Sequence, residues 1–143
     1  MKTILVSLML IFSSATYSQN EEVKQVVVTF FKGFHAKDSI TIKSVCADKM
    51  ILQSISESSK GTQLKNDSAQ DFFRSIATIP NTILFEEKLL DYSIQVDGAM
   101  AQVWTPYEFY VNNKLSHKGV NAFTLFKDNG LWKIVYLIDT RRK

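Results

Sequence analysis

The C-terminal segment, residues 99–143, constrains the fold most, because it contains three strand-like runs separated by short turn signals. The turn signals lie at 112–114 (NNK) and 127–130 (KDNG), and the runs between them are rich in aromatic residues. Such runs, joined by turns rich in Asn and Gly, are typical of antiparallel strands connected by hairpins. The segment therefore predicts a curved antiparallel sheet with a few polar side chains set into it.

A further strand is predicted just upstream, over residues 84–96. Asp97-Gly98 is a strong two-residue hairpin signal and predicts the turn that leads into the strand at 99–111. Strands over 115–126 and 131–138 then complete a meander of four strands. Two short strands are also predicted earlier in the chain, at 50–55 and 62–65.

The N-terminal half predicts three helices. Residues 22–37 carry an apolar stripe at helical spacing, made by Val23, Val26, Val27, Phe30 and Phe34. Asp38-Ser39 predicts the cap of a short second helix that buries Cys46, and Ser68 begins a third helix that Pro80 ends. Helices followed by a meander predict an α+β domain with the helices on one face of a bent sheet.

The first 18 residues have the pattern of a secretory signal. Lys2 supplies a positive start, an apolar run follows over 4–12, and 16–18 (TYS) offers small residues for a signal peptidase. We expect cleavage between Ser18 and Gln19 and export, to the periplasm or out of the cell. The apolar run is shorter than the about 20 residues that a membrane-spanning helix needs, so no membrane association is expected after cleavage.

Composition excludes several classes of function. The formal net charge is only +3 and the basic residues are scattered, so we expect no nucleic-acid partner. With two histidines and one cysteine, and no clustered ligand spacing, we expect no metal. No glycine-rich phosphate loop is present, and no cofactor is expected.

Five segments together resemble the nuclear transport factor 2-like superfamily. They lie at 31–38 (FKGFHAKD), 104–110 (WTPYEFY), 116–123 (SHKGVNAF), 129–134 (NGLWKI) and 139–142 (DTRR). The last blocks are similar to small exported bacterial members of its lumazine-binding-like and polyketide-cyclase-like group. The resemblance covers residues 19–143. It implies a cone-shaped α+β domain, usually dimeric, in which three N-terminal-half helices pack on a curved antiparallel sheet around a deep pocket.

This superfamily includes isomerases, cyclases, dehydratases, epoxide hydrolases and binding modules, so the fold alone does not set the function. Its ketosteroid isomerase-like members use a tyrosine, a carboxylate base and a protonated acid. The corresponding positions here hold Phe30, Ser54 and Ala122. None of these side chains can perform those roles, which excludes a steroid isomerase.

Two residues are candidate catalytic bases. His117 shares one strand face with Gly119 and Asn121, where it could act toward a bound carbonyl, or could be a structural histidine on the dimer face. Asp139, followed by Arg141, could activate water or could form a structural ion pair. The candidate ligand-binding residues are the aromatic and polar side chains expected near the pocket: Phe31, His35, Trp104, Tyr107, Asn121, Tyr136 and Arg141.

The last strand predicts a partner for the sheet. Simple alternation places Trp132, Ile134, Tyr136 and Ile138 on one face and leaves apolar residues on the other face as well. Helices can cover only one side, so the other must meet something else. We expect a homodimer through this sheet face.

We therefore expect an exported module that binds a small hydrophobic or aromatic molecule in the cone pocket. The first alternative is a cofactor-independent isomerase, dehydratase or hydrolase that uses His117 or Asp139 as general base. The second is a protein-interaction module whose sheet face binds a different protein.

Overall fold

The structure, a computed structural model, describes residues 2–143, with side chains from Tyr17 onward. Its helices and strands, in chain order, are α1 (Lys2–His35), α2 (Ser39–Ser44), β1 (Cys46–Ser58), β2 (Gly61–Asp67), α3 (Ala69–Ala77), β3 (Phe85–Leu89), β4 (Ser93–Asp97), β5 (Met100–Val111), β6 (Lys114–Asp128) and β7 (Leu131–Arg141).

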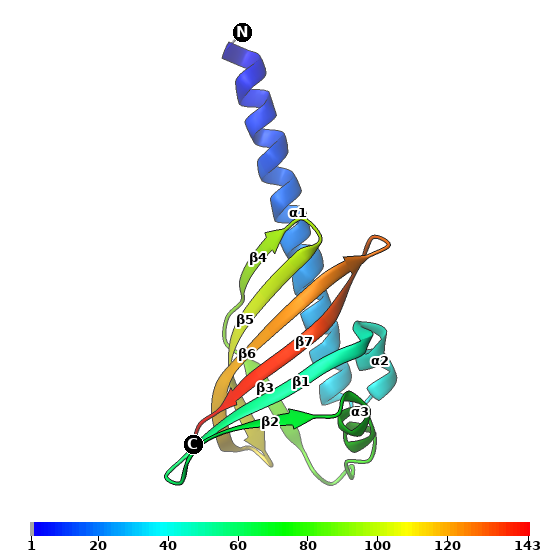
Figure 1. The fold of residues 1–143 in the computed structure, drawn as a ribbon, viewed down its shortest axis with the longest axis vertical. Coiled ribbons are helices and arrows are strands. Elements are labelled where there is room, and N and C mark those ends of the chain that lie inside the picture. Colours follow the sequence, from blue (N-terminus) through cyan, green and yellow to red (C-terminus); the bar gives the residue numbers. More distant parts are fainter. Residues whose placement is uncertain (1) are drawn as a thin grey trace.

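The seven strands form one curved sheet in the order β2-β1-β7-β6-β5-β3, with β4 also paired to β5 (Figure 1). The predicted antiparallel hairpins β5–β6 and β6–β7 are present. The sheet as a whole is mixed, however, because β1 runs parallel to β7. A parallel pair needs a long connection. Here residues 59–130, about half of the chain, separate the two strands, so no local turn signal could have predicted the pairing.

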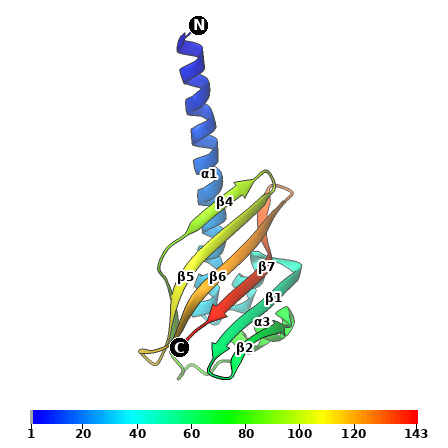
Figure 2. The ribbon, with the colours of Figure 1, turned by 60° about the vertical axis from the view of Figure 1, so that its left-hand side comes forward.

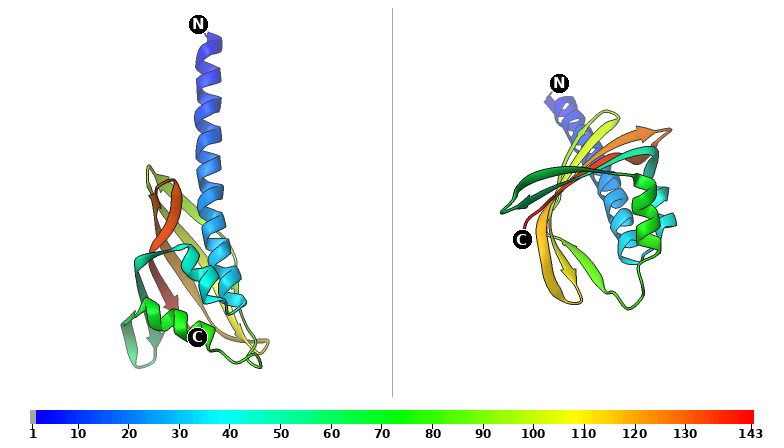
Figure 3. Two further views of the ribbon diagram at one scale, coloured as in Figure 1. Left: turned by 90° about the vertical axis from the view of Figure 1, so that its right-hand side faces the viewer. Right: turned by 60° about the horizontal axis from the view of Figure 1, so that its bottom comes forward.

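The helices pack on one face of the sheet, as predicted, while the sheet curves around them without closing (Figure 3). α1 contributes Val23, Val27, Phe30 and Phe31 to the core, where they meet Phe123 and Leu125 of β6. The α+β architecture predicted from the element order is confirmed.

The N-terminal part of α1 extends beyond the sheet (Figure 2). The predicted secretory signal falls on this part, and the side chains of residues 1–16 lie outside those described. The signal therefore stays a prediction. Among the described residues, no helix combines the length and the apolar character needed to cross a membrane.

The predicted helix caps are confirmed. The Asp38 carboxylate accepts hydrogen bonds from the backbone N–H groups of Ile40 and Thr41 at 3.0 and 3.1 Å, which starts α2. The Ser68 hydroxyl accepts from Asp71 N at 3.3 Å and starts α3.

Cys46 differs from the prediction in that it begins β1 rather than lying in a helix. Burial raises the pKa of its thiol to about 12, which makes it a packing residue.

The single strand predicted over 84–96 is divided into β3 and β4. Both pair with β5, but β3 pairs with its C-terminal part and β4 with its N-terminal part. The division falls opposite Pro106, which has no backbone N–H and so cannot donate a hydrogen bond to the neighbouring strand. The one backbone hydrogen bond at this point is donated by Leu90 N to Pro106 O, at 2.9 Å. The missing donor explains why one continuous strand does not form there.

A β-bulge at Val135 changes which side chains of β7 face the helices. Ile134 pairs with Leu125 and Tyr136 with Thr124, so Val135 is an extra residue on β7. Trp132 and Ile134 are buried toward the helices, but beyond the bulge Leu137 and Asp139 face inward instead. The prediction that Tyr136 and Ile138 share a face with Ile134 is therefore wrong, and the bulge is what turns Asp139 into the interior.

Candidate functional site

A cavity of about 650 Å³ lies between α1, α3 and the inner face of the sheet. The helices line it with Phe30, Phe31 and Phe34 of α1 and Phe72 of α3. The inner face of the sheet contributes the apolar Leu52 and Leu137 and the polar Glu87, Asn121, Asp139 and Arg141, and further polar residues line the cavity at 65–68, 71 and 75. A smaller hollow of about 390 Å³ adjoins it and shares Phe34, Phe72, Ser75, Glu87, Asp139 and Arg141. The shared walls make the two hollows one continuous site.

Asp139 is the centre of a polar cluster that joins three strands. Its Oδ1 accepts from the Ser54 hydroxyl of β1, and its Oδ2 accepts from Arg141 Nε at 2.8 Å and Tyr107 OH at 3.2 Å. Arg141 Nη2 also donates to Ser54 Oγ at 3.0 Å. Burial and the nearby carboxylates raise the pKa of Tyr107, so its hydroxyl stays protonated and can donate. Both Asp139 oxygens are therefore occupied.

Gly119 lets the end of β7 approach this cluster. The single hydroxyl proton of Tyr107 is shared between Asp139 Oδ2 and the nearer Thr140 O, at 2.8 Å, and Val120 N donates to Thr140 Oγ1 at 3.0 Å. A Cβ atom at Gly119 would lie 1.7 Å from Thr140 O, so only glycine fits beneath that carbonyl.

Glu87 lines the site but was not among the candidate residues predicted from the sequence. Its Oε1 accepts from Asn121 Nδ2 at 2.6 Å, and its backbone N donates to His35 Nε2 of α1 at 3.0 Å. Burial raises the pKa of Glu87 to about 7, and Asp139 adds to the rise, while Asn121 and Arg141 act against it. The alternation of inward-facing and outward-facing residues along β3 could have predicted this position, because Glu87 lies two residues from each of the inward-facing Phe85 and Leu89.

His117 lines the smaller hollow, on the inner face of the sheet. Its ring lies 4.9 Å from that of Phe109 and 5.8 Å from that of Tyr107, between ring centroids. Burial, together with the positive charge of Arg141, lowers the pKa of His117, so the imidazole is neutral near pH 7. The structure thus brings His117, Asp139, Tyr107, Asn121, Arg141 and Phe31 to the same site.

Trp104 and Tyr136, both predicted to bind ligand, lie elsewhere. They face outward and line a hollow of about 450 Å³ on the outer face of the sheet. Trp104 is on the opposite side of β5 from Tyr107 because Pro106 introduces no bulge between them, and Tyr136 is turned outward by the bulge at Val135. Both therefore lie outside the cavity between the helices and the sheet, and a role for them in ligand binding stays a prediction.

His35 contacts the site only indirectly. Its ring packs beside Phe31 and Phe34, and its Nε2 accepts the Glu87 N–H. Burial lowers the pKa of His35, consistent with a neutral acceptor nitrogen. His35 thus positions Glu87 by tying β3 to α1.

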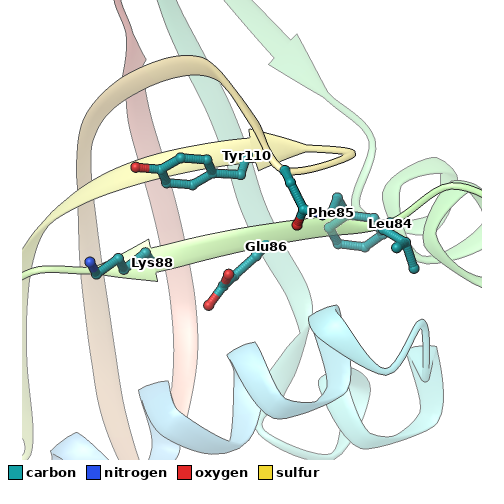
Figure 4. Close-up of a pocket in the computed structure, with 6 residues that line it drawn as sticks. Leu84, Phe85, Glu86, Lys88 and Tyr110 are labelled. Atoms are coloured by element: carbon teal, nitrogen blue, oxygen red, sulfur yellow. The ribbon is translucent and has the colours of Figure 1, made fainter.

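A separate hollow of about 470 Å³ lies at the β3 edge of the sheet, where Leu84, Glu86 and Lys88 of the β3 segment meet Tyr110 of β5 (Figure 4). Tyr110 OH donates to Glu108 at 2.8 Å. The side chains are exposed or half-exposed, and nothing among them resembles a reactive cluster. Within the described part of the chain, no three His, Cys, Asp or Glu residues are grouped as metal ligands.

No protein-family model matches the sequence, and no curated protein matches it significantly. Solved structures do match. A nuclear transport factor 2-like protein of unknown function from Shewanella baltica is 14% identical, with a TM-score of 0.66, over 89% of this chain and 96% of that one. One from Cytophaga hutchinsonii is 12% identical, with a TM-score of 0.71, over 87% and 98%. A candidate dehydratase of the same family from Streptomyces avermitilis is 16% identical, with a TM-score of 0.68, over 90% and 99%.

The chain therefore has the nuclear transport factor 2-like fold, and the resemblance predicted from the sequence is confirmed at that level. The lumazine-binding-like subgroup stays a prediction. At these identities the likeness concerns the fold, and the function has to be argued from the cavity itself.

Proposed function

We propose that the protein binds a small, largely apolar molecule in the cavity between the helices and the sheet. The observation that carries the proposal is the division of this cavity into a phenylalanine-rich wall and a compact polar wall. Ligand sites typically measure about 300–1,000 Å³ and combine apolar walls with a few convergent polar groups. The volume of about 650 Å³ and the grouping of Glu87, Asn121, Asp139 and Arg141 fit that description.

The phenylalanine rings that line the cavity are arranged so that they could contact a flat or elongated apolar ligand. Phe72 is stacked nearly parallel to Phe30 and to Phe34, with ring centroids 6.2 and 6.3 Å apart. Such rings offer large contact areas with little conformational freedom to lose on binding. The polar wall would then orient one end of the ligand.

A cofactor-independent enzyme is the second candidate, as an isomerase, dehydratase or hydrolase. His117 suits the role of general base better than Asp139, because its imidazole is neutral whereas both Asp139 oxygens already accept hydrogen bonds. The candidate dehydratase among the similar structures is in keeping with this alternative. If the protein converted a bound ligand into a product, it would be an enzyme rather than a binding module.

Ser75→Trp is expected to weaken binding of the neutral dye Nile red at least about tenfold. Ser75 is exposed on α3 and lines both parts of the cavity, so an indole there would block the space at little cost to the core. Fluorescence titration measures the affinity. Arg74→Trp, one residue away and outside the cavity lining, is the control and should bind the dye as the unmodified protein does. Equal binding by both variants would count against the cavity as the site.

We further propose that the outer face of the sheet pairs with a second copy of the chain. Apolar side chains are spread over this face, and several are about half exposed: Ile51, Met100, Trp104 and Phe126. An apolar surface this broad favours association, and a symmetric pair is the simplest arrangement. The alternative occupant is a different protein, as in an interaction module.

Light scattering on the purified protein is expected to give twice the mass of one chain. Trp104→Glu, which places a charge near the centre of the face, should give the monomer mass without loss of the folded circular dichroism spectrum. If the unmodified protein already had the mass of one chain, the homodimer would be eliminated, and a different protein would remain as the partner of the outer face. Native mass spectrometry of material from the original host would also show any retained ligand, and would test the prediction that the chain is cleaved and begins at Gln19.

A further inference from the structure

Glu87 is an acidic group of the cavity that forms no ion pair with the residues whose side chains are described, although the charge of Arg141 acts on it. Three other carboxylates line the cavity, and each forms an ion pair: Asp139 with Arg141 at 2.8 Å, Asp67 with Lys65 at 2.6 Å and Asp71 with Arg74 at 3.0 Å. Among the residues whose side chains are described, no ion pair includes Glu87. Glu87 is only partly exposed, and a carboxylate partly removed from water without a counter-ion carries a cost, so this position is unusual for a purely structural residue.

The Glu87 carboxyl is held in place and aimed at the cavity. Asn121 fixes Oε1 at 2.6 Å, and the bond from Glu87 N to His35 Nε2 fixes the backbone. No hydrogen bond within the described residues occupies Oε2. Glu87 lines both parts of the cavity together with Phe34 and Phe72. A carboxyl oxygen without a hydrogen bond among the described residues thus belongs to a cavity that is also lined by aromatic rings.

We propose that the ligand of this cavity is an amphipathic amine, whose protonated amino group pairs with Glu87 while its apolar body lies against the phenylalanine wall. This inference rests on the proposed binding function and names the class of ligand. An ammonium group would supply the missing counter-ion, and the phenylalanines that line the same cavity could also attract its positive charge. A carboxylate ligand would instead meet the negative charges of Glu87 and Asp139, and Arg141 is already paired with Asp139 and bonded to Ser54, although three of its N–H groups are not used in these bonds.

Proton linkage gives the binding a distinctive pH dependence. The pKa of Glu87 is about 7 in the free protein, so below that pH the carboxyl is largely protonated and must release its proton before it can pair with an ammonium group. Affinity for the amine should therefore rise with pH up to about 7 and then level off, becoming about tenfold weaker at about pH 6 than at about pH 8. The charged or titratable groups around Glu87 are Asp139 and Arg141 of β7, His117 of β6, Tyr107 of β5 and His35 of α1.

Competition against Nile red with three matched compounds tests the inference: phenylbutylamine, the neutral phenylbutanol and the anionic phenylbutyrate. At about pH 8 the amine should displace the dye at a concentration at least about tenfold lower than the alcohol, and the acid should be the weakest. Glu87→Gln should remove the preference for the amine while the alcohol competes as before. Glu86→Gln is the matched control, because it changes the neighbouring residue of β3, whose side chain is exposed on the opposite face.

The outcomes separate the two proposals. If the dye binds and Ser75→Trp blocks it, but the alcohol or the acid competes as well as the amine, the ligand class is overturned while the binding site stands. If Ser75→Trp does not change the affinity for the dye and none of the three compounds displaces it, the proposal that this cavity binds a ligand is overturned, and the proposed class of ligand falls with it. Should Glu87→Gln not fold, the pH series on the unmodified protein decides, since an affinity for the amine that is flat from about pH 6 to about pH 8 overturns the role of Glu87.

Discussion

Gly119→Ala is expected to lower the free energy of unfolding by about 3 kcal/mol, because the new methyl group would overlap the backbone of β7. The Cβ atom would lie 1.7 Å from Thr140 O and 2.7 Å from Thr140 C, and a backbone cannot move aside as a flexible side chain can. Displacing Thr140 would also break the hydrogen bond that its carbonyl accepts from Tyr107 at 2.8 Å. The substitution should therefore damage both stability and the geometry around Asp139.

Urea denaturation, followed by tryptophan fluorescence, measures this loss, and the melting temperature should fall by about 10 °C. Gly130→Ala is the matched control. Gly130 has φ +82° but nothing within 4 Å of the added atom, so its replacement costs only the backbone strain, about 1 kcal/mol. Similar losses for the two variants would contradict the close approach at Gly119.

Asp139→Asn is expected to cost about 2–3 kcal/mol of stability, although it changes the volume of the side chain very little. The carboxylate accepts from three donors, and an amide would turn an NH₂ group toward Arg141, Tyr107 or Ser54. It would also leave the Arg141 guanidinium without its counter-ion. Because the Arg141 side chain is 52% exposed, water can partly replace the lost partner, which places the cost below that of a fully buried pair.

Thermal and urea unfolding check this prediction against two controls. Tyr107→Phe removes one donor to the same carboxylate and should cost about 1 kcal/mol. Asp71→Asn breaks the Asp71–Arg74 pair on the surface, where both side chains are well exposed, and should change stability by less than about 1 kcal/mol. If Asp139→Asn is as mild as Asp71→Asn, the cluster around Asp139 is not an important source of stability.

The sequence predicted the helices well because their signals are local. The apolar stripe of α1 and the caps at Asp38 and Ser68 involve residues within a few positions of one another, and each is present in the structure. The hairpin turns at Asp97-Gly98 and Asn129-Gly130 are equally local, and they too are correct. The nuclear transport factor 2-like fold was accessible from the sequence for the same reason.

The site was predicted only in part, because its geometry depends on irregular features of the sheet. Strict alternation along β7 would have separated Asp139 from the helix-facing side that Ile134 occupies, and the extra residue Val135 reverses that result. Ser54 joins Asp139 only through the parallel pairing of β1 with β7. Neither the bulge nor the parallel pair has a signature in neighbouring residues.

Glu87 was missed for a different reason. It stands in the run Phe85-Glu86-Glu87-Lys88-Leu89, where three consecutive charged residues suggest an exposed strand. The alternation shows that only Glu86 and Lys88 face solvent, while Glu87 shares the inner face with the two apolar residues. A charged residue between two apolar residues at a spacing of two is thus the pattern worth testing in chains of this fold.

The division of the strand at 84–96 also bears on how readily this edge of the sheet could recruit another molecule. A sheet edge that is long, flat and unpaired can recruit the edge of another molecule. Here that edge is two strands of only five residues each, interrupted opposite Pro106, and β3 exposes Glu86 and Lys88. Because each piece is short and the ladder is broken at Pro106, we expect this edge to be a poor template for the addition of a foreign strand.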